Sequence, residues 1–126
     1  MITQYFADFG NIVNGLDFVL NSEIHIRKIN DFLGVIETKL TFEFGVLDIL
    51  EVIKLTDNQI SKKKYKYHFR RPTGEMIFRY DNAPHHQNVA TFPHHKHLES
   101  VITESIEPEI VQILAEIKAI IIENND

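Results

Sequence analysis

The sequence of 126 residues predicts an α+β fold, in which an antiparallel sheet of about five strands carries N- and C-terminal helices on one face. Three observations support it. Apolar residues recur every three or four positions near both termini, they alternate with polar residues over positions 34–45, and Pro72-Thr73-Gly74 separates two further alternating runs. A histidine-rich loop is expected after the last hairpin. The length suits a single domain over residues 1–126.

The first predicted element is a helix at the N-terminus. Its apolar positions follow three- and four-residue steps: Ile2, Tyr5, Phe6, Phe9, Ile12, Val13 and Leu16. Gly10 and Gly15 disfavour a helix, so we expect it to be short or broken. Residues 21–30 are predicted to form a strand, because Ile24 and Ile26 alternate with polar residues.

Two more strands are predicted in the middle of the chain. Over residues 34–45, one face takes the residues Ile36, Thr38, Leu40, Phe42 and Phe44, and the other face is charged or polar. This period of two describes a strand with one face in water. In residues 46–55 apolar side chains fall on both faces, which predicts a central strand or one with a bulge. A turn is expected at Asp57-Asn58.

A hairpin is predicted over residues 62–81. If Pro72 and Thr73 are its two loop residues, Tyr65, Tyr67 and Phe69 lie opposite Tyr80, Phe78 and Met76 on one apolar face. The other face then carries Lys66, His68, Arg70 and Arg79. A three-residue loop with a glycine bulge breaks this match, so the pattern favours the shorter loop.

The chain is predicted to end in a loop and a helix. After Asp81 the strand pattern stops, and the stretch up to His97 is expected to be an ordered loop. The helix is predicted to have Pro108 in its first turn and an apolar stripe formed by Ile110, Ile113, Leu114, Ile117 and Ile121. Further apolar residues at Val111, Ile120 and Ile122 widen that stripe, which is compatible with a partner surface or a homodimer through this helix.

The net charge of −5 averages a basic segment and an acidic body. Residues 61–97 hold eight of the 13 lysines and arginines but only two of the 18 acidic residues. Such a segment is an argument about partners, because it attracts phosphates, and RNA is one possible partner. Cysteine is absent, which excludes disulfides and thiolate chemistry. No apolar run reaches the roughly 18–20 residues of a membrane span, and the N-terminus lacks signal-peptide features, so we expect a cytoplasmic protein without membrane contact.

Five of the seven histidines lie between Arg79 and His97, and several chemistries are compatible with them. A pair at His95 and His97, completed by His85 or Asp81, would suit zinc, but the spacing follows no known ligand pattern. We therefore expect no obligatory metal or other cofactor. Two histidines with an arginine or lysine could instead cleave RNA through its own 2′-hydroxyl. The histidines could also serve structure, or dock a protein in a non-enzymatic binding module.

The segment from Tyr67 to His97 resembles the TumE family of toxins from prokaryotic toxin–antitoxin pairs. The resemblance rests on YHFRRPTGEMIFRYDNAPHH followed by TFPHHKH. It implies a cytoplasmic toxin that is neutralised by a cognate antitoxin, typically one with a helix-turn-helix DNA-binding domain. It implies no particular toxic mechanism. Phe69 and Tyr80 stand where relatives often have tryptophan, which keeps the aromatic packing.

The residues and the resemblance together define the candidate site. Its candidate catalytic residues, with roles unassigned, are Arg79, Asp81, His85, His86, His94, His95 and His97. Its candidate substrate-binding residues are His68, Arg70, Asn82 and Lys96. The leading hypothesis is a toxin that acts as a metal-independent ribonuclease. Its alternatives are a binding module whose histidine-rich loop docks the antitoxin or another protein, and a histidine-ligated metal-binding protein.

Overall fold

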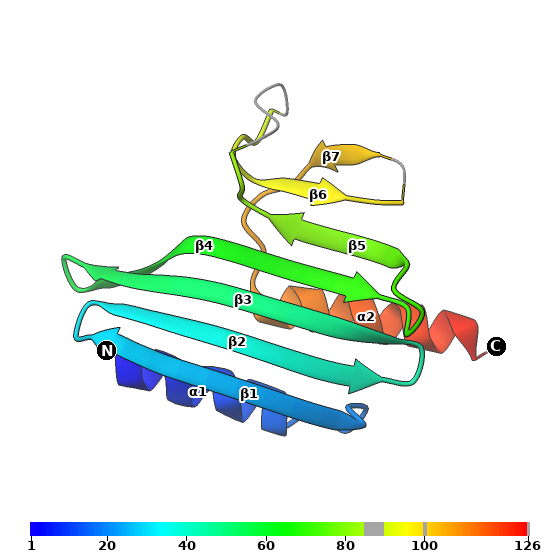
Figure 1. Cartoon of the computed structure of the whole chain (residues 1–126), viewed down its shortest axis with the longest axis horizontal. Coiled ribbons are helices and arrows are strands. Elements are labelled where there is room, and N and C mark those ends of the chain that lie inside the picture. The colour runs from blue at the N-terminus through cyan, green and yellow to red at the C-terminus, as the bar shows by residue number, and fades with distance from the viewer. Residues whose placement is uncertain (85–89, 100, 126) are drawn as a thin grey trace.

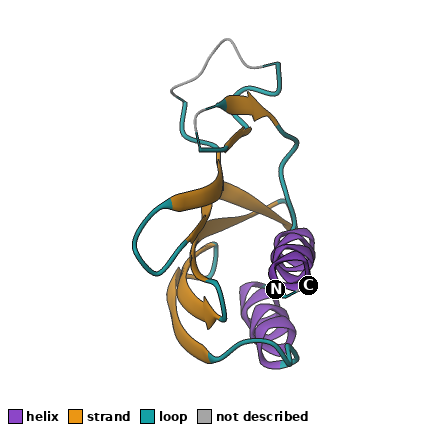
Figure 2. Cartoon of the chain, turned by 90° about the vertical axis from the view of Figure 1, so that its right-hand side faces the viewer, coloured by secondary structure: helices purple, strands orange, loops and turns teal. Residues whose placement is uncertain are grey.

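A seven-stranded antiparallel sheet with two helices on one of its faces forms the protein (Figures 1 and 2). The computed structural model describes residues 1–84, 90–99 and 101–125. The elements in chain order are α1 (Ile2–Asn14), β1 (Asn21–Asn30), β2 (Leu33–Phe42), β3 (Gly45–Thr56), β4 (Gln59–Arg70), β5 (Met76–Asp81), β6 (His95–His97), β7 (Ile102–Glu104) and α2 (Ile110–Asn124). Each strand pairs with the next one along the chain. The α+β prediction is confirmed, with seven strands in place of about five.

Helix α1 is continuous, although a short or broken helix was expected. Gly10 lies inside it, and Gly15 forms its C-cap. Ile2, Phe9 and Val13 are buried. This burial outweighs the cost of about 1 kcal/mol that one glycine brings to a helix interior, because most helix stability in proteins comes from packing an apolar face.

The loop between β4 and β5 has three residues, so the predicted two-residue loop is wrong. The Arg71 N–H donates to the Glu75 carbonyl (2.8 Å), and the Gly74 N–H donates to the Arg71 carbonyl (2.9 Å). Pro72, Thr73 and Gly74 therefore form the loop, and Gly74 has a φ of +104° that glycine adopts without strain.

A second irregularity compensates for the longer loop. Ile77 is an extra residue on β5, at a bulge between the Phe69–Phe78 pair and the end of the hairpin. Without it, aromatic residues of β4 would face polar positions on β5, because a slip of one residue reverses the faces. With it, Phe69 lies opposite Phe78 and Tyr67 opposite Tyr80, each two residues further along β5 than predicted. The aromatic residues therefore share one face of the hairpin, as predicted, but the pairing of β4 with β5 has a different register.

The histidine-rich stretch is not entirely a loop. His95–His97 forms β6, in which His97 pairs with Arg79 and His95 pairs with Asp81. A further short strand, β7, pairs with β6. The sequence did not predict these strands, because three polar residues carry no apolar alternation. His85 and His86, two of the candidate catalytic residues, lie outside the described residues.

The core lies between the sheet and the two helices (Figure 2). From α2 it receives Ile110, Ile113, Leu114, Ile117 and Ile121. Val111 and Ile122 remain more than half exposed, at 54% and 53%. Glu109 is the N-cap of α2, so Pro108 precedes the helix. No helix within the described part of the chain is long and apolar enough to cross a membrane.

Candidate functional site

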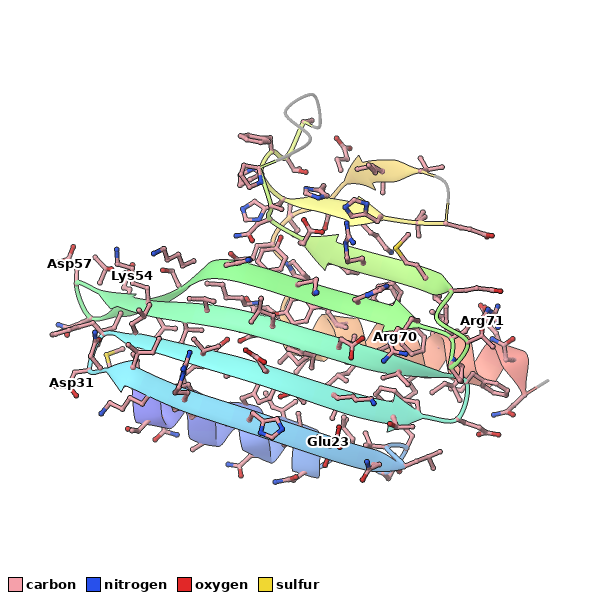
Figure 3. All side chains as sticks on the ribbon, viewed as in Figure 1. Glu23, Asp31, Lys54, Asp57, Arg70 and Arg71 are labelled. Carbon is pink, nitrogen blue, oxygen red and sulfur yellow. The ribbon has the colours of Figure 1, made fainter. Side chains whose placement is uncertain are left out.

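The face of the sheet opposite the helices, called the open face below, carries most of the predicted site residues. Residues in register across antiparallel strands project to the same side. Strand pairing therefore places six residues in one row across the sheet: Glu23, Lys39, Asp48, His68, Arg79 and His97. The next row holds His25, Glu37, Leu50, Lys66, Asp81 and His95. Figure 3 views this face, with Glu23 labelled on β1 and Arg70 labelled on β4.

Asp81 is the centre of a cluster formed with Arg79, His95 and His97, called the Asp81 cluster below. One carboxylate oxygen, Oδ1, lies 2.7 Å from His95 Nε2 and accepts the Ala83 N–H at 3.0 Å. The other, Oδ2, accepts from Arg79 Nε at 2.9 Å and lies 3.3 Å from His97 Nε2. Asp81 is 5% exposed. A carboxylate is buried at acceptable cost only when donors and positive charge surround it, and these neighbours supply both.

His95 presents both of its ring nitrogens to acceptors. Its Nδ1 lies 2.8 Å from the Pro93 carbonyl oxygen, and its Nε2 faces Asp81. A neutral imidazole has one N–H, so two such bonds require either an imidazolium or a proton on Asp81. Arg79 also contacts Asp81, on its other carboxylate oxygen. His95 is 1% exposed, so it positions the cluster.

Arg79 and His97 form the side of the cluster that is nearer to solvent. Arg79 Nη2 lies 3.0 Å from His97 Nε2, and the Arg79 side chain is 35% exposed. A guanidinium only donates, so His97 Nε2 accepts from Arg79 in the tautomer that leaves this nitrogen unprotonated and donates to Asp81 Oδ2 when it is protonated. The arrangement can hold an anionic oxygen at Arg79 beside a nitrogen that can accept a proton.

His68, on β4, lies opposite Arg79 of β5 and is half-buried. Its pKa is lowered, first by burial and then by the nearby cations Arg79, Lys66 and Arg70, while Asp48 opposes the shift. Its Nε2 atom is buried without a hydrogen-bond partner among the described residues. His68 is therefore a neutral neighbour of the Asp81 cluster.

Lys96 is not brought to the Asp81 cluster, although it stands between His95 and His97 in sequence. Strand alternation turns it to the helix side, where Nζ lies 2.5 Å from Glu116 Oε1 on α2 and 4.8 Å from the ring centre of Tyr80. Burial acts to lower the Lys96 pKa, but the hydrogen bonds with Glu116 and Tyr80 outweigh it, and the pKa is raised.

Two other candidates lie beside the cluster. Asn82 extends the β4–β5 pairing with its side chain, because Oδ1 accepts the Tyr65 N–H (3.0 Å) and Nδ2 donates to the Lys63 carbonyl (3.2 Å). His94 stacks on the Tyr65 ring, and its Nδ1 lies 2.9 Å from the Tyr65 hydroxyl oxygen. A third candidate, Arg70, lies on the open face at the end of β4, where its Nε is 2.8 Å from Asp48 Oδ2.

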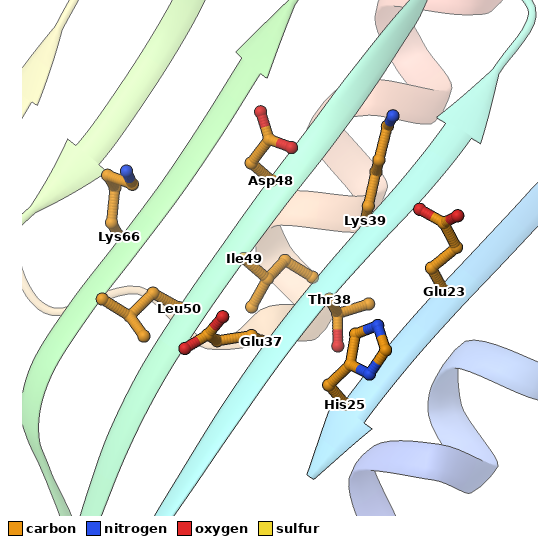
Figure 4. Close-up of a pocket in the computed structure, with 9 residues that line it drawn as sticks. All are labelled: Glu23, His25, Glu37, Thr38, Lys39, Asp48, Ile49, Leu50 and Lys66. Carbon is orange, nitrogen blue, oxygen red and sulfur yellow. The ribbon is translucent and has the colours of Figure 1, made fainter.

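The sequence did not predict the concavity that covers β1 to β4 on the open face (Figure 4). Its volume is about 440 Å³. Its lining contains three carboxylates, from Glu23, Glu37 and Asp48, and two ammonium groups, from Lys39 and Lys66. Their mixture favours no single ligand charge, and the Asp81 cluster is not part of its lining.

A metal ion would find suitable ligand atoms in the Asp81 cluster. One carboxylate oxygen of Asp81 and one ring nitrogen each from His95 and His97 all lie within 4.8 Å of one another. Zinc accepts this set of ligands. However, Arg79 already contacts both Asp81 Oδ2 and His97 Nε2, and its positive charge opposes a bound cation.

A second buried carboxylate, which sequence reasoning missed, lies on the helix side of the sheet. Glu51 on β3 is 0% exposed and accepts hydrogen bonds from the Tyr5 and Tyr67 hydroxyls. Lys62 Nζ donates to the Tyr67 hydroxyl (2.7 Å) and the Pro108 carbonyl (2.5 Å), and it lies 4.0 Å from Glu51. The one sequence signal was an acidic residue inside the apolar run of a central strand.

The fold and the open-face cluster define a small α+β protein with a polar candidate site on the face of its sheet opposite the helices. A family model described as Toxin TumE matches residues 8–122. The chain therefore belongs to the TumE toxin family, which confirms the resemblance seen in the sequence. Membership gives it a toxin role in a toxin–antitoxin system and a cognate antitoxin as partner. The comparison with curated proteins and the comparison with solved structures found no match.

Proposed function

We propose that this toxin acts in the cytoplasm as a metal-independent ribonuclease, with the Asp81 cluster as its active site. The observation that carries the proposal is the position of Arg79. Asp81 holds it at 2.9 Å, it touches His97 at 3.0 Å, and a third of its side chain reaches the open face. A fixed guanidinium beside a histidine nitrogen is suited to a phosphodiester.

The proposed roles follow from the contacts. When Arg79 donates to a phosphoryl oxygen in place of His97 Nε2, that nitrogen takes the proton of the RNA 2′-hydroxyl, whose oxygen then bonds to the adjacent phosphorus. Arg79 donates to a phosphoryl oxygen and stabilises the charge that develops there. The bond from phosphorus to the 5′-oxygen breaks, and that oxygen takes a proton from water. Asp81 and His95 hold Arg79 and His97 in position.

The test compares cleavage by purified, antitoxin-free toxin and its variants. Wild type should cut RNA in the presence of EDTA, leave a 2′,3′-cyclic phosphate, and spare a substrate with 2′-deoxyribose at the cleaved position. Arg79→Ala and His97→Ala should each lower the rate by about 10²–10³-fold. His25→Ala is the matched control, because His25 is exposed on the same face at β1. Growth arrest with every class of RNA intact would overturn the ribonuclease and keep the toxin role.

A metal centre is the second candidate, and one observation favours it. Besides the three clustered ligand atoms, His95 Nδ1 contacts the Pro93 carbonyl, which is the outer hydrogen bond that metal-bound histidines usually make. Elemental analysis of tag-free protein tests it. Zinc near one per chain, lost in His95→Ala and His97→Ala but kept in His25→Ala, would replace the metal-independent mechanism. Its affinity should then fall below about pH 6, as the imidazoles become protonated.

We also propose that the cognate antitoxin carries a helix-turn-helix domain, as the family resemblance implies.

A homodimer through α2 would have to use Val111 and Ile122, since Ile113 and Ile117 are buried in the core. Light scattering of Ile122→Glu tests that dimer. A wild-type mass of one chain, or a dimer mass unchanged by the substitution, would exclude it.

A further inference from the structure

A hollow of about 520 Å³ lies next to the Asp81 cluster. Its size falls in the range of small-molecule sites, about 300–1,000 Å³. Val52, Ala83 and Pro84 contribute to its apolar lining, and Lys63 and Lys64 supply positive charge. Both lysines are exposed, and neither has an ion-pair partner within the described ranges. The hollow therefore combines an apolar surface with free cations.

The sheet creates this hollow in two ways. Strand β5 ends at Asp81, opposite Lys66, so no strand of the described residues lies beside the earlier part of β4 on that edge. In addition, a bulge in the β3–β4 pairing makes Lys63 an extra residue between Lys62 and Lys64. Bulges re-aim side chains, and here Lys63 and Lys64 line the same hollow.

The wall of the hollow is tied to the cluster by hydrogen bonds. Ala83 donates its N–H to Asp81 Oδ1 at 3.0 Å, and Asn82 bonds to the β4 backbone at both ends of its amide. The same carboxylate also holds Arg79. A ligand group in the hollow would thus lie at a fixed place relative to Arg79.

A line of cations leads along β4 from the hollow. Lys64, Lys66 and Arg70 share the open face with His68, at every second residue. Alternate residues of a strand are about 6.6–6.8 Å apart, which is comparable to the spacing of successive phosphates in an extended single strand of nucleic acid. Arg70 pairs with Asp48, whereas no described carboxylate lies within 4.0 Å of the Lys66 ammonium. This line can follow a phosphate backbone.

We infer that the hollow binds one nucleobase of single-stranded RNA, while the backbone of that strand follows β4 and places a neighbouring phosphate at Arg79. The inference rests on the proposed ribonuclease function and names its substrate class. A base inside a duplex is stacked and paired, so it cannot enter a hollow without being flipped out. The lysines attract the phosphates, and the apolar wall receives the base.

The probe is a fluorescein-labelled single-stranded DNA oligonucleotide, which lacks the 2′-hydroxyl and is not cut. Anisotropy over a range of KCl concentrations measures its affinity. The Lys63→Ala/Lys64→Ala double variant should weaken binding and reduce the slope of log K against log salt by about 1.4, or about 0.7 for each lost phosphate contact. Val52→Glu should weaken binding at least tenfold, because it places a carboxylate in the hollow.

The matched control is Lys39→Ala/Lys118→Ala, which removes the same charge at β2 and α2, away from the hollow. Thermal unfolding by circular dichroism confirms that each variant is folded. Equal losses in both double variants, or equal affinity for a duplex of the same sequence, would overturn the inference. Cleavage of RNA that is unaffected by the hollow variants would overturn it and leave the ribonuclease standing. Weakened oligonucleotide binding in a toxin that cuts no RNA would support the hollow and overturn the ribonuclease.

Discussion

Two buried carboxylates, Glu51 and Asp81, lie on opposite faces of the same sheet and differ in what surrounds them. Glu51 is enclosed between sheet and helices by two tyrosine hydroxyls and Lys62. Asp81 is surrounded by a guanidinium and two imidazoles on the face that no helix covers. Their exposures are 0% and 5%, so burial alone does not separate them.

The comparison shows that the kind of donor and the access to solvent distinguish the two carboxylates, whereas burial does not. Burial and the adjacent Glu51 raise the pKa of Tyr5 and of Tyr67, so both hydroxyls stay protonated at neutral pH. The tyrosine hydroxyls beside Glu51 therefore keep a fixed state. Arg79 reaches the open face, so the Asp81 cluster can meet an anion there.

The largest expected effect on stability is at Glu51. Glu51→Ala should lower the free energy of unfolding by about 3–5 kcal/mol, because it leaves the buried Lys62 ammonium without its counter-charge and two tyrosine hydroxyls without their acceptor. Urea unfolding measures the loss. Any toxin that remains folded should keep the wild-type rate per molecule. Loss of activity in a Glu51 variant of normal stability would show that Glu51 is not only structural and would contradict the difference proposed between Glu51 and Asp81.

Asp81 should show the opposite balance. Asp81→Asn keeps the size of the side chain but removes the negative charge that orients Arg79 and His95. The cleavage rate should fall about 10²-fold or more, while the free energy of unfolding falls by about 1–3 kcal/mol. Rate assays and urea unfolding on the same preparation separate the two. A variant that unfolds as easily as Glu51→Ala but retains its rate would make the Asp81 cluster structural.

A smaller, pH-dependent effect is expected at His68. Its pKa is lowered in the folded state, so below the unfolded value of about 6.5 the unfolded chain binds more protons. The stability that neutral His68 contributes is therefore complete above that pH and is lost as the pH falls toward the lowered pKa. His68→Gln should flatten the decline of unfolding free energy between about pH 7 and pH 5. His25→Gln, at an exposed position on β1, is the matched control. An identical decline in both variants would contradict the shift.

The smallest effect is expected at Lys96, which faces α2. Lys96→Met keeps the length of the side chain and removes the contact with Glu116, so the free energy of unfolding should fall by about 1 kcal/mol. RNA binding and cleavage should not change. A specific loss of RNA affinity in this variant would return Lys96 to the substrate-binding residues, as the sequence had suggested.

Local patterns determined the elements that bury apolar residues at a regular period. The alternation of Ile36, Leu40 and Phe42 specifies β2, because a strand with one wet face has a period of two. The stripe of α2 is specified in the same way by a period near 3.6. The sequence motif that contains Arg79 and the clustered histidines also identified the family, since such a motif is recognised from the amino-acid sequence alone.

Tertiary structure decided the composition of the site. Asp81 meets His95 and His97 because β6 pairs with β5, and a strand of three polar residues has no periodicity by which a sequence could reveal it. The same pairing separates Lys96 from its two neighbours, since successive side chains of a strand point to opposite faces. The β4–β5 register depended on a compensating bulge at Ile77, which keeps Tyr67 and Phe69 opposite Tyr80 and Phe78 on the core side of the sheet. Periodicity reports which residues are buried along one element, whereas a site is formed by contacts between elements.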